Sequence, residues 1–428
     1  MTMLTHKLPT LVVALVASSS LLSLSIHGFS IGNRNVVNKL HNFGSTIDHN
    51  SRLERPVLHA ESSAASTTPT SSTTEENVNQ LKKVLEREYV SFFDPMEREY
   101  YSPKVTFDDP MTSLAGVDSY QNNVDMLASR TLLGKILFDD AGIVLHSVTG
   151  GEVNPTDNSI SNIITRWTLR VTAKILPWSP TARFSGISVY EVKAGGPKGV
   201  MVTHQTDYWD SINIKEGGTG SYQTVDKNIA VQDFLNQLKP NNFAAPAAGL
   251  EVPHQLLRRG NGYEVRKYPS YTATQIQYTR RDEGYDALSS ITKGLSPLAP
   301  AILEVASSGD KFMTWPLEYA LPGQATPPPP IQVEQKLNEQ SQWTKSWNAK
   351  VMTIPSRVVA VGRFKDASVE PVVRKADREL RECCKRDGLV VSSKTEGVVK
   401  FAQYDAIFSM GERRGEVWIE LEDGGHPW

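Results

Sequence analysis

Two adjacent carboxylates followed by a proline, Asp108-Asp109-Pro110, are the residues of this chain whose types first suggest chemistry. A pocket carboxylate beside a tyrosine hydroxyl can exchange protons with a bound small molecule. Asp-Pro also begins turns, in which paired carboxylates are solvated, and this is the simpler interpretation. Acid–base chemistry therefore requires that Asp108 or Asp109 point into a pocket. The tyrosines near this motif in the sequence are Tyr100, Tyr101 and Tyr120.

The two cysteines of the chain, Cys383 and Cys384, are adjacent. Neighbouring cysteines rarely bridge each other, because a disulfide needs Cα atoms placed across a gap. Without nearby His or Asp at ligand spacing they predict no zinc site either. We interpret them as one buried small apolar residue and one residue at the rim of a helix. The mature protein is then expected in a reducing or non-secretory compartment.

Length and charge exclude some classes of protein. A chain of 428 residues is long enough for two or three domains with cores of their own. The formal net charge is −2 and no Lys/Arg block stands out, so the sequence predicts no nucleic-acid partner. After removal of the leader described next, we expect no stable membrane span.

The N-terminus has the pattern of a targeting leader. Lys7 precedes an apolar, Ser-containing run, and Gly28 offers a small residue for cleavage, which is typical of a signal peptide over 1–28. Phe29 then opens a basic, Ser/Asn-rich segment, and a Ser/Thr linker follows, so we expect 29–74 to be transit peptide and disordered linker. The whole resembles the bipartite leader of algal plastid proteins. It predicts a stroma-like plastid location, with the secretory pathway as the alternative.

Residues 75–216 are predicted to form an α+β domain. A helix with Val78, Leu81 and Leu85 on one face comes first, and a second helix is expected near 116–130. Four antiparallel strands follow, at 142–149, 163–171, 184–192 and 199–209. Helices followed by a run of strands favour helices on one face of a curved sheet. The pattern resembles the nuclear-transport-factor-like cone, with Trp167 and Trp209 as pocket or core lining. Residues 217–249 are expected to be a linker with a short helix.

The second domain, 250–428, has two strand–helix–strand halves, which suggests a pseudo-two-fold β-barrel flanked by two helices. The segment Tyr263 to Tyr268, the strand RVVAVGRF at 357–364 and the ending GEVWIELED at 415–423 resemble the SOUL haem-binding family in order and spacing. In plant and algal plastid proteins, a domain with the cone fold precedes such a SOUL domain. Residues 313–316 match the family's Met-Thr-x-Pro segment, or form the next strand after loss of a hairpin.

The SOUL resemblance implies a haem or other tetrapyrrole as ligand. Some members place a His ligand where this chain has Lys267, and the histidines of the second domain, His254 and His426, lie at its extremities. We therefore expect reversible binding by an apolar face, with cations pairing the propionates. A solvated lysine or arginine and a core methionine are the alternative interpretations, and Leu288, Ile291 and Leu295 are expected in the core under either of them. The predicted cofactor-binding residues are Lys267, Leu288, Ile291, Leu295, Met313 and Arg363.

The leading hypothesis is a non-enzymatic plastid protein that binds a tetrapyrrole for buffering or delivery. In it, the first domain binds a protein partner or a second apolar ligand. One alternative is a structural or protein-interaction module that kept the barrel without the ligand. Another is a small-molecule enzyme, an isomerase or hydrolase, in the first domain. No catalytic or metal-binding residue is predicted for the leading hypothesis.

Overall fold

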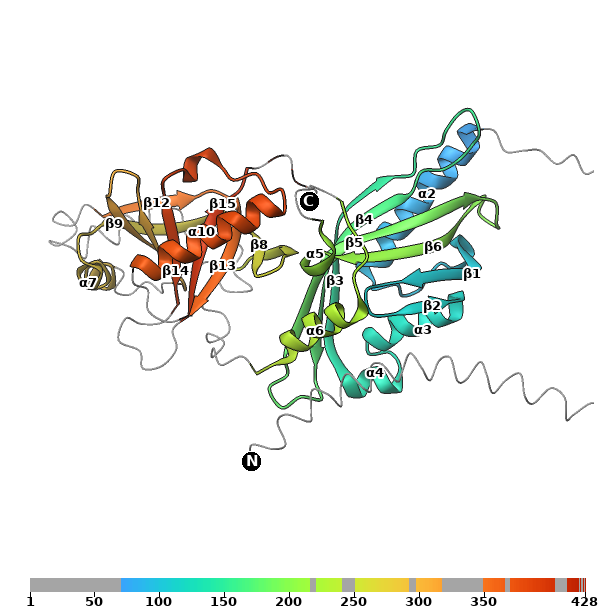
Figure 1. The fold of residues 1–428 in the computed structure, drawn as a ribbon, viewed down its shortest axis with the longest axis horizontal. Coiled ribbons are helices and arrows are strands. Elements are labelled where there is room, and N and C mark those ends of the chain that lie inside the picture. Colours follow the sequence, from blue (N-terminus) through green and yellow to red (C-terminus); the bar gives the residue numbers. More distant parts are fainter. Residues whose placement is uncertain are drawn as a thin grey trace, which may run out of the picture.

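The structure is a computed structural model that describes residues 71–215, 221–240, 251–291, 298–317, 349–365, 370–404 and 414–422, with Gly424, His426 and Trp428. It contains two α+β domains, each built around one sheet (Figure 1). The N-terminal domain is a curved sheet whose inner side is covered by helices, and the C-terminal domain is a curled, barrel-like sheet with two helices on one face. This confirms the predicted fold class.

The N-terminal sheet has six strands in the order β2-β1-β6-β5-β4-β3. Its neighbours are antiparallel except β1 and β6, which pair in parallel. Long strands with successive residues on opposite faces let one face enclose an apolar interior. The strands are β1 (Tyr101–Asp108), β2 (Ser113–Ala115), β3 (Phe138–Gly150), β4 (Ile163–Ala173), β5 (Thr181–Ala194) and β6 (Val200–Trp209).

Helix α2 shows why this domain folds as the sequence predicts. Its residues Val78, Leu81, Leu85 and Tyr89 share one face and are each at most 1% exposed. This face packs against β3 and β6. Helices α3 and α4 lie beside the sheet, and α6 packs on β5 (Figure 1). The helices are α2 (Ser71–Val90), α3 (Val117–Leu127), α4 (Leu132–Leu137), α5 (Asp210–Asn213) and α6 (Lys227–Leu238).

The C-terminal sheet has nine strands in the order β12-β9-β11-β10-β14-β15-β13-β8-β7. All its paired neighbours are antiparallel. The elements are β7 (Gln255–Arg259), β8 (Tyr263–Tyr268), β9 (Tyr271–Gln277), α7 (Arg281–Ile291), β10 (Ala301–Val305), β11 (Lys311–Pro316), β12 (Lys350–Ile354), β13 (Arg357–Lys365), α10 (Glu370–Arg386), β14 (Val399–Gln403) and β15 (Arg414–Glu420).

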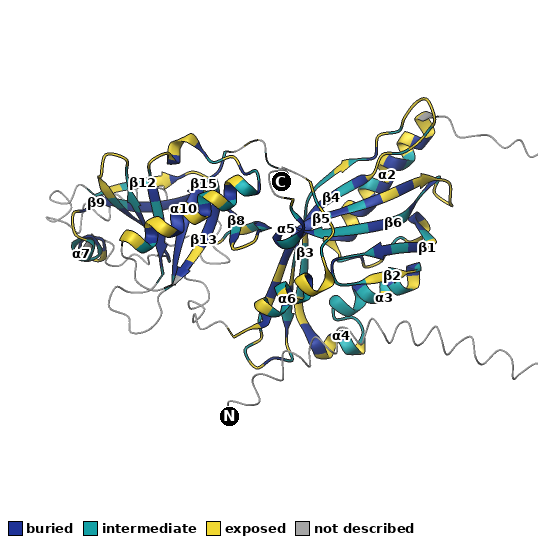
Figure 2. Ribbon diagram, viewed as in Figure 1, coloured by how far each residue is buried: buried dark blue, intermediate teal, exposed yellow. Residues whose placement is uncertain are grey.

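The two faces of this sheet differ in chemistry. One face packs under α7 and α10 in a single apolar cluster, and both helices carry exposed residues on their outer sides (Figure 2). The other face combines a smaller apolar cluster with buried ion pairs. There the Arg266 Nη1 atom lies 2.9 Å from Glu416 Oε2, and its Nη2 atom lies 2.6 Å from Glu264 Oε2. A charge this deep in protein requires such a partner.

The structure decides between the two interpretations of residues 313–316. They end β11, which forms an antiparallel hairpin with β10 in which Ile302 pairs with Thr314, so no hairpin is missing before them. The strands β10, β12 and β7 were not predicted from the sequence. β12 follows a segment outside the described residues, and its five residues are too few for a clear alternation. None of the described helices combines the length and the apolar character needed to cross a bilayer.

A buried ion pair lies where the two domains meet. The Arg166 Nη2 atom on β4 donates to Asp210 Oδ2 at 2.7 Å, and both side chains are at most 2% exposed. Burial alone would raise the pKa of Asp210, but the positive charges of Arg166 and Arg258 outweigh it and lower the pKa to about 2. Arg258 belongs to β7, the barrel strand that packs against β4 and β5. Ser185 donates to the same Asp210 oxygen and accepts from the backbone N–H of Arg259.

We expect Asp210→Asn to lower the free energy of unfolding by about 3–5 kcal/mol, because it leaves a buried guanidinium uncompensated. The loss should be full above pH 4 and shrink as the pH falls towards 2, where the wild-type carboxylate itself becomes protonated. Urea unfolding followed by tryptophan fluorescence measures it. Asp140→Asn is the matched control, since Asp140 pairs with Arg170 at 3.0 Å on the exposed surface and should contribute less than about 1 kcal/mol. Equal losses in both variants would contradict the role of Asp210.

Candidate functional site

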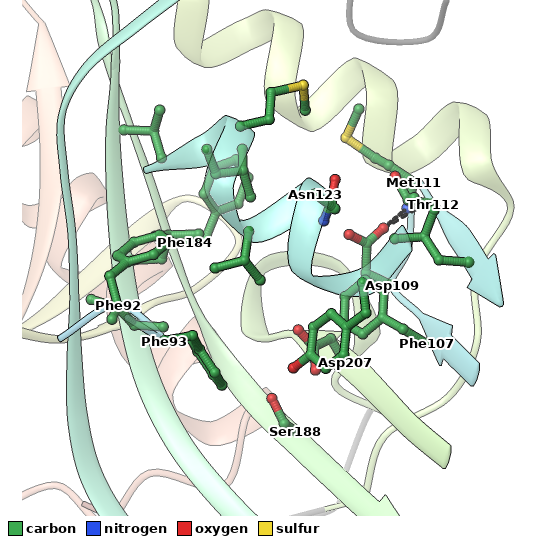
Figure 3. A pocket seen from close by; sticks show the side chains of 18 of the residues that line it. Phe92, Phe93, Phe107, Asp109, Met111, Thr112, Asn123, Phe184, Ser188 and Asp207 are labelled. Carbon is green, nitrogen blue, oxygen red and sulfur yellow. Dashed lines mark hydrogen bonds between the residues drawn. The ribbon is translucent and has the colours of Figure 1, made fainter. Parts of the chain in front are cut away.

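The N-terminal domain encloses a cavity of about 440 Å³ between the inner face of its sheet and the helices α3, α4 and α6. That volume lies within the range of small-molecule sites. The lining is mainly apolar and includes ten aromatic residues. In Figure 3, Phe107 lies beside Asp109 and Asp207, and Phe92, Phe93 and Phe184 lie across the cavity from them. The aromatic residues are Tyr89, Phe92, Phe93, Phe107, Tyr120, Phe138, Trp167, Phe184, Trp209 and Phe234.

Asp109 follows the end of β1 and lines the cavity. Its Oδ1 atom accepts hydrogen bonds from the backbone N–H groups of Met111 at 2.6 Å and Thr112 at 2.5 Å (Figure 3). Burial raises the pKa of Asp109 to about 6, although these two hydrogen bonds oppose the shift. The turn predicted for Asp-Pro is therefore present, and the carboxyl group still faces the cavity.

Asp207 lines the cavity from β6. Its Oδ1 atom accepts a hydrogen bond from Gln205 Nε2 at 2.8 Å. Burial raises the pKa of Asp207 to about 7; hydrogen bonds from Ser188 and Gln205 oppose the shift, and the nearby charge of Asp109 adds to it. Near neutral pH both carboxyl groups therefore exchange between protonated and ionised forms, which suits either proton transfer or pairing with a cation.

A hydrogen-bond network fixes the wall behind Asp207. Tyr120 donates to Gln205 Oε1 at 2.6 Å, so the Gln205 amide is free to turn its N–H groups to Asp207. Trp167 Nε1 donates to Ser188 Oγ at 2.8 Å. The ring of Tyr120 also stacks on Phe107, with centroids 5.2 Å apart. These contacts hold the polar groups of the site before any ligand arrives.

The sequence located part of this site. Asp109, Tyr120, Trp167 and Trp209 were singled out, and all line the cavity. Asp108 points elsewhere: its carboxylate is about half exposed and lies 3.9 Å from His204 Nε2.

Two residues singled out with them lie near the site rather than in its lining, and one that matters was missed. Tyr100 is buried in the same apolar core. Tyr101 donates to Glu88 Oε2 at 2.6 Å. Asp207 was not predicted, although its alternation with Gln205 and Trp209 on one face of a predicted strand was a usable signal.

In the barrel, the six predicted cofactor-binding residues do not gather at one place. Leu288 and Met313 are both 0% exposed and belong to the cluster under α7 and α10. Ile291 ends α7, and Leu295 lies outside the described residues. Lys267 is exposed on β8.

Arg363 lies on β13 and is half exposed. It already faces two carboxylates, Glu264 at 3.6 Å and Glu416 at 3.7 Å, on the opposite face of the sheet from Leu288 and Met313. Whether any of the six residues contacts a ligand stays a prediction.

The barrel surface beside α7 carries a half-buried apolar row. Trp315 on β11 and Val351 on β12 both lie opposite Thr274 of the intervening strand β9. The ring of Tyr285 on α7 meets Trp315 edge-on at 5.7 Å. We call Tyr285, Trp315 and Val351 the α7 row. Exposed Lys350 precedes Val351 in the chain.

Other groups with coordinating atoms are placed away from this row. The ring of His254 packs on Tyr268 at 5.3 Å, and burial, followed by the charge of Arg266, lowers its pKa to about 4. Cys384 is buried and Cys383 half-buried on α10, as expected. Within the described residues, no group of three or more His, Cys, Asp or Glu side chains is arranged to hold a metal ion.

Comparisons with protein families find one match in each domain. Residues 250–420 match the family described as "SOUL heme-binding protein", and residues 79–204 match the family described as "Uncharacterized conserved protein (DUF2358)". A search of curated proteins found no match. The chain therefore carries a match to the DUF2358 family over its N-terminal domain and a match to the SOUL haem-binding family over its C-terminal domain.

Solved structures resemble parts of the chain. A nuclear transport factor 2-like superfamily protein from Salmonella enterica serovar Typhimurium is 12% identical; the match covers 36% of this chain and 100% of that one, with a TM-score of 0.27. A putative scytalone dehydratase from Novosphingobium aromaticivorans is 8% identical over 33% of this chain and 88% of that one, with a TM-score of 0.26. The EcmrR C-terminal domain is 10% identical over 40% of this chain and 98% of that one, with a TM-score of 0.27.

We expect Asp207→Asn to raise the free energy of unfolding at pH 8 by at least about 1.4 kcal/mol, the equivalent of one pKa unit. A carboxyl group with a raised pKa disfavours the folded state once it is ionised, and this penalty grows as the pH rises from the unfolded pKa to the folded one. The gain should therefore be smaller at pH 5.5. Urea unfolding at the two pH values measures it, with Asp108→Asn as control. A loss of stability at pH 8 would show that the ionised Asp207 is held by favourable interactions instead.

Proposed function

We propose that the C-terminal domain binds haem or a related tetrapyrrole reversibly, without axial coordination and without catalysing a reaction. The observation that carries this proposal is the match of residues 250–420 to the SOUL haem-binding family. The family match supports tetrapyrrole binding in general. The mode of binding rests on the side chains of this barrel, since Lys267 stands where some members have a histidine.

We assign the macrocycle to the α7 row. Leu288 and Met313 are enclosed in the core, so on this surface the apolar area open to a ligand comes from Tyr285, Trp315 and Val351. A flat aromatic ligand gains from burial against apolar side chains and from edge or stacking contacts with aromatic rings. Lys350 is exposed, but as the neighbour of Val351 on β12 it starts from the opposite face of the sheet, so the row itself presents apolar and aromatic side chains only. Leu288 and Met313 then support the row from beneath.

This arrangement suits a carrier. An apolar row that offers no iron ligand binds and releases a tetrapyrrole more readily than a site that coordinates haem, because there an iron–ligand bond must break. Buffering or delivery of a tetrapyrrole requires such exchange. A plastid is the compartment that we propose, on the basis of the leader pattern at 1–74, because a signal-like segment is followed there by a basic, Ser/Thr-rich segment.

We expect Val351→Asp to weaken hemin binding at least about tenfold, because it places a carboxylate against the apolar macrocycle. The matched control is Val390→Asp, at an exposed valine of the same domain that lies outside the α7 row. Titration of the full chain followed at the Soret band measures both variants. Protoporphyrin IX should bind within a few-fold of hemin if no iron ligand is used. No saturable binding by the wild-type chain would favour the interaction module instead, and equal loss in both variants would remove the α7 row as the site.

We expect residues 1–74, fused to a fluorescent protein and expressed in an alga with a multiply wrapped plastid, to direct the fusion to the plastid stroma. A second fusion that keeps 1–28 but lacks 29–74 should stop in the secretory pathway, since the transit segment is what directs the later step. Fluorescence microscopy against chlorophyll emission measures both. Secretion of the complete fusion would contradict the plastid assignment.

A further inference from the structure

The ionisable side chains that line the N-terminal cavity carry only one sign of charge. The lining contains two carboxyl groups, Asp109 and Asp207, while none of the described residues that form it is a lysine, arginine or histidine. The other polar groups are neutral, and the rest of the wall is aromatic or aliphatic. An enclosure that holds acidic groups without a basic one favours a ligand that brings the positive charge.

The groups around the two carboxyls do not neutralise them. Asp207 faces the hydroxyl-bearing side chains of Ser188 and Tyr89, the Gln205 amide and Asp109. The charge of Lys227, at the start of α6 and outside the lining, lowers the pKa of Asp109, and the charge of the neighbouring Asp108 raises it. His204 contacts Thr106 and Thr206 instead, and it alternates to the other face of β6 from Asp207.

We propose that this cavity binds a compact organic cation, a protonated amine on an apolar body. Its ammonium group lies at Asp109 and Asp207, and its body packs among the rings of Phe107, Phe184 and Trp209. The site is separate from the tetrapyrrole site assigned to the barrel and does not depend on it.

The chemistry of the lining favours this class of ligand over an anion or a neutral alcohol. Aromatic faces attract a desolvated cation through their quadrupole, and the two carboxyl groups provide charge-assisted hydrogen bonds to an ammonium group. A carboxylate-bearing ligand, including a tetrapyrrole with propionates, would be repelled by both acids with no base to offset them. A neutral alcohol of the same shape gains the apolar contacts but leaves the acids without a counter-charge.

The binding should depend on pH in a defined direction. An alkylammonium stays charged up to about pH 10, so the titrating groups in the neutral range are the two carboxyls. Their raised pKa values mean that they are largely protonated at pH 5 and ionised at pH 8. Affinity for an amine should therefore rise as the pH increases from 5 to 8 and level off above that.

Three probes of matched shape test the proposal on the full chain: 4-phenylbutylamine, 4-phenyl-1-butanol and 4-phenylbutyrate. Calorimetry at pH 8 should rank the amine above the alcohol by at least about tenfold, the strength of one charge-assisted hydrogen bond, with the carboxylate weakest. Quenching of Trp167 and Trp209, which line the cavity, gives a second readout. Equal affinity for amine and alcohol, tighter binding of the carboxylate, or no binding of any probe would each overturn the proposal.

Variants then test the two acids. Asp207→Asn and Asp109→Asn should bring the affinity for the amine close to that for the alcohol and flatten its pH dependence, while the alcohol binds as before. Asp108→Asn is the matched control: it removes a neighbouring carboxylate outside the lining and should leave the ranking unchanged. If Asp108→Asn lowers the affinity for the amine as much as the other two variants do, the effect comes from the overall negative charge of the domain, and the proposed site is wrong. If Asp109→Asn fails to fold, Asp207→Asn and the wild-type pH profile decide the outcome.

Discussion

The carboxylate of Asp210 is the group on which the arrangement of the two domains depends. It is fully buried, and a buried charge is tolerated only when its partners compensate for the lost hydration. Its partners are Arg166 of β4, Ser185 of β5, Tyr222 and Arg258 of β7, so they come from both domains. The ring of Trp428 covers both guanidinium groups, 5.6 Å from Arg166 Cζ and 5.1 Å from Arg258 Cζ. These contacts hold strand β7 of the C-terminal domain against strands β4 and β5 of the N-terminal domain.

Three residues earlier on the same stretch of chain, Asp207 has the opposite environment. Two guanidinium groups hold Asp210 ionised, with a pKa of about 2, whereas burial without a cation raises the pKa of Asp207 to about 7. Pairs of like groups whose environments separate their pKa values are a common mark of functional sites. The basic side chains of this region gather at the joint between the domains, and the acids remain alone in the cavity. A half-buried acid with a raised pKa lowers stability once it is ionised, so its presence in the cavity lining points to a role other than folding.

The sequence predicted the main helices and strands of both domains but only part of the site. Long alternating strands such as 163–171 and amphipathic helices such as α2 follow from local patterns of apolar residues, so they can be predicted without knowledge of the tertiary structure. The cavity is assembled from residues of β1, β6 and α3 that are far apart in the chain. The motif around Asp109 was visible because Asp-Pro is a local signal, whereas Asp207 acquires its character only from what encloses it. In the barrel, Leu288 is core, as the helical spacing predicted, whereas the surface row formed by Trp315 and Val351 depends on strand pairing across β9, which no local pattern reveals.

The two proposed sites differ in the ligand they suit because their scaffolds differ. The barrel surface presents half-buried rings without a nearby carboxylate in the α7 row, which suits the apolar macrocycle of a tetrapyrrole. The interior of a cone cannot keep an unpaired lysine charged, but it can hold carboxyls whose protons come and go near neutral pH. The joint at Asp210 keeps both scaffolds in one geometry, because Trp209 and Phe184 of the cavity wall are the chain neighbours of Asp210 and Ser185. The same segments thus carry both the contacts between the domains and aromatic residues of the cavity lining. The packing between the domains therefore also fixes these aromatic side chains, so the site is formed before a ligand binds.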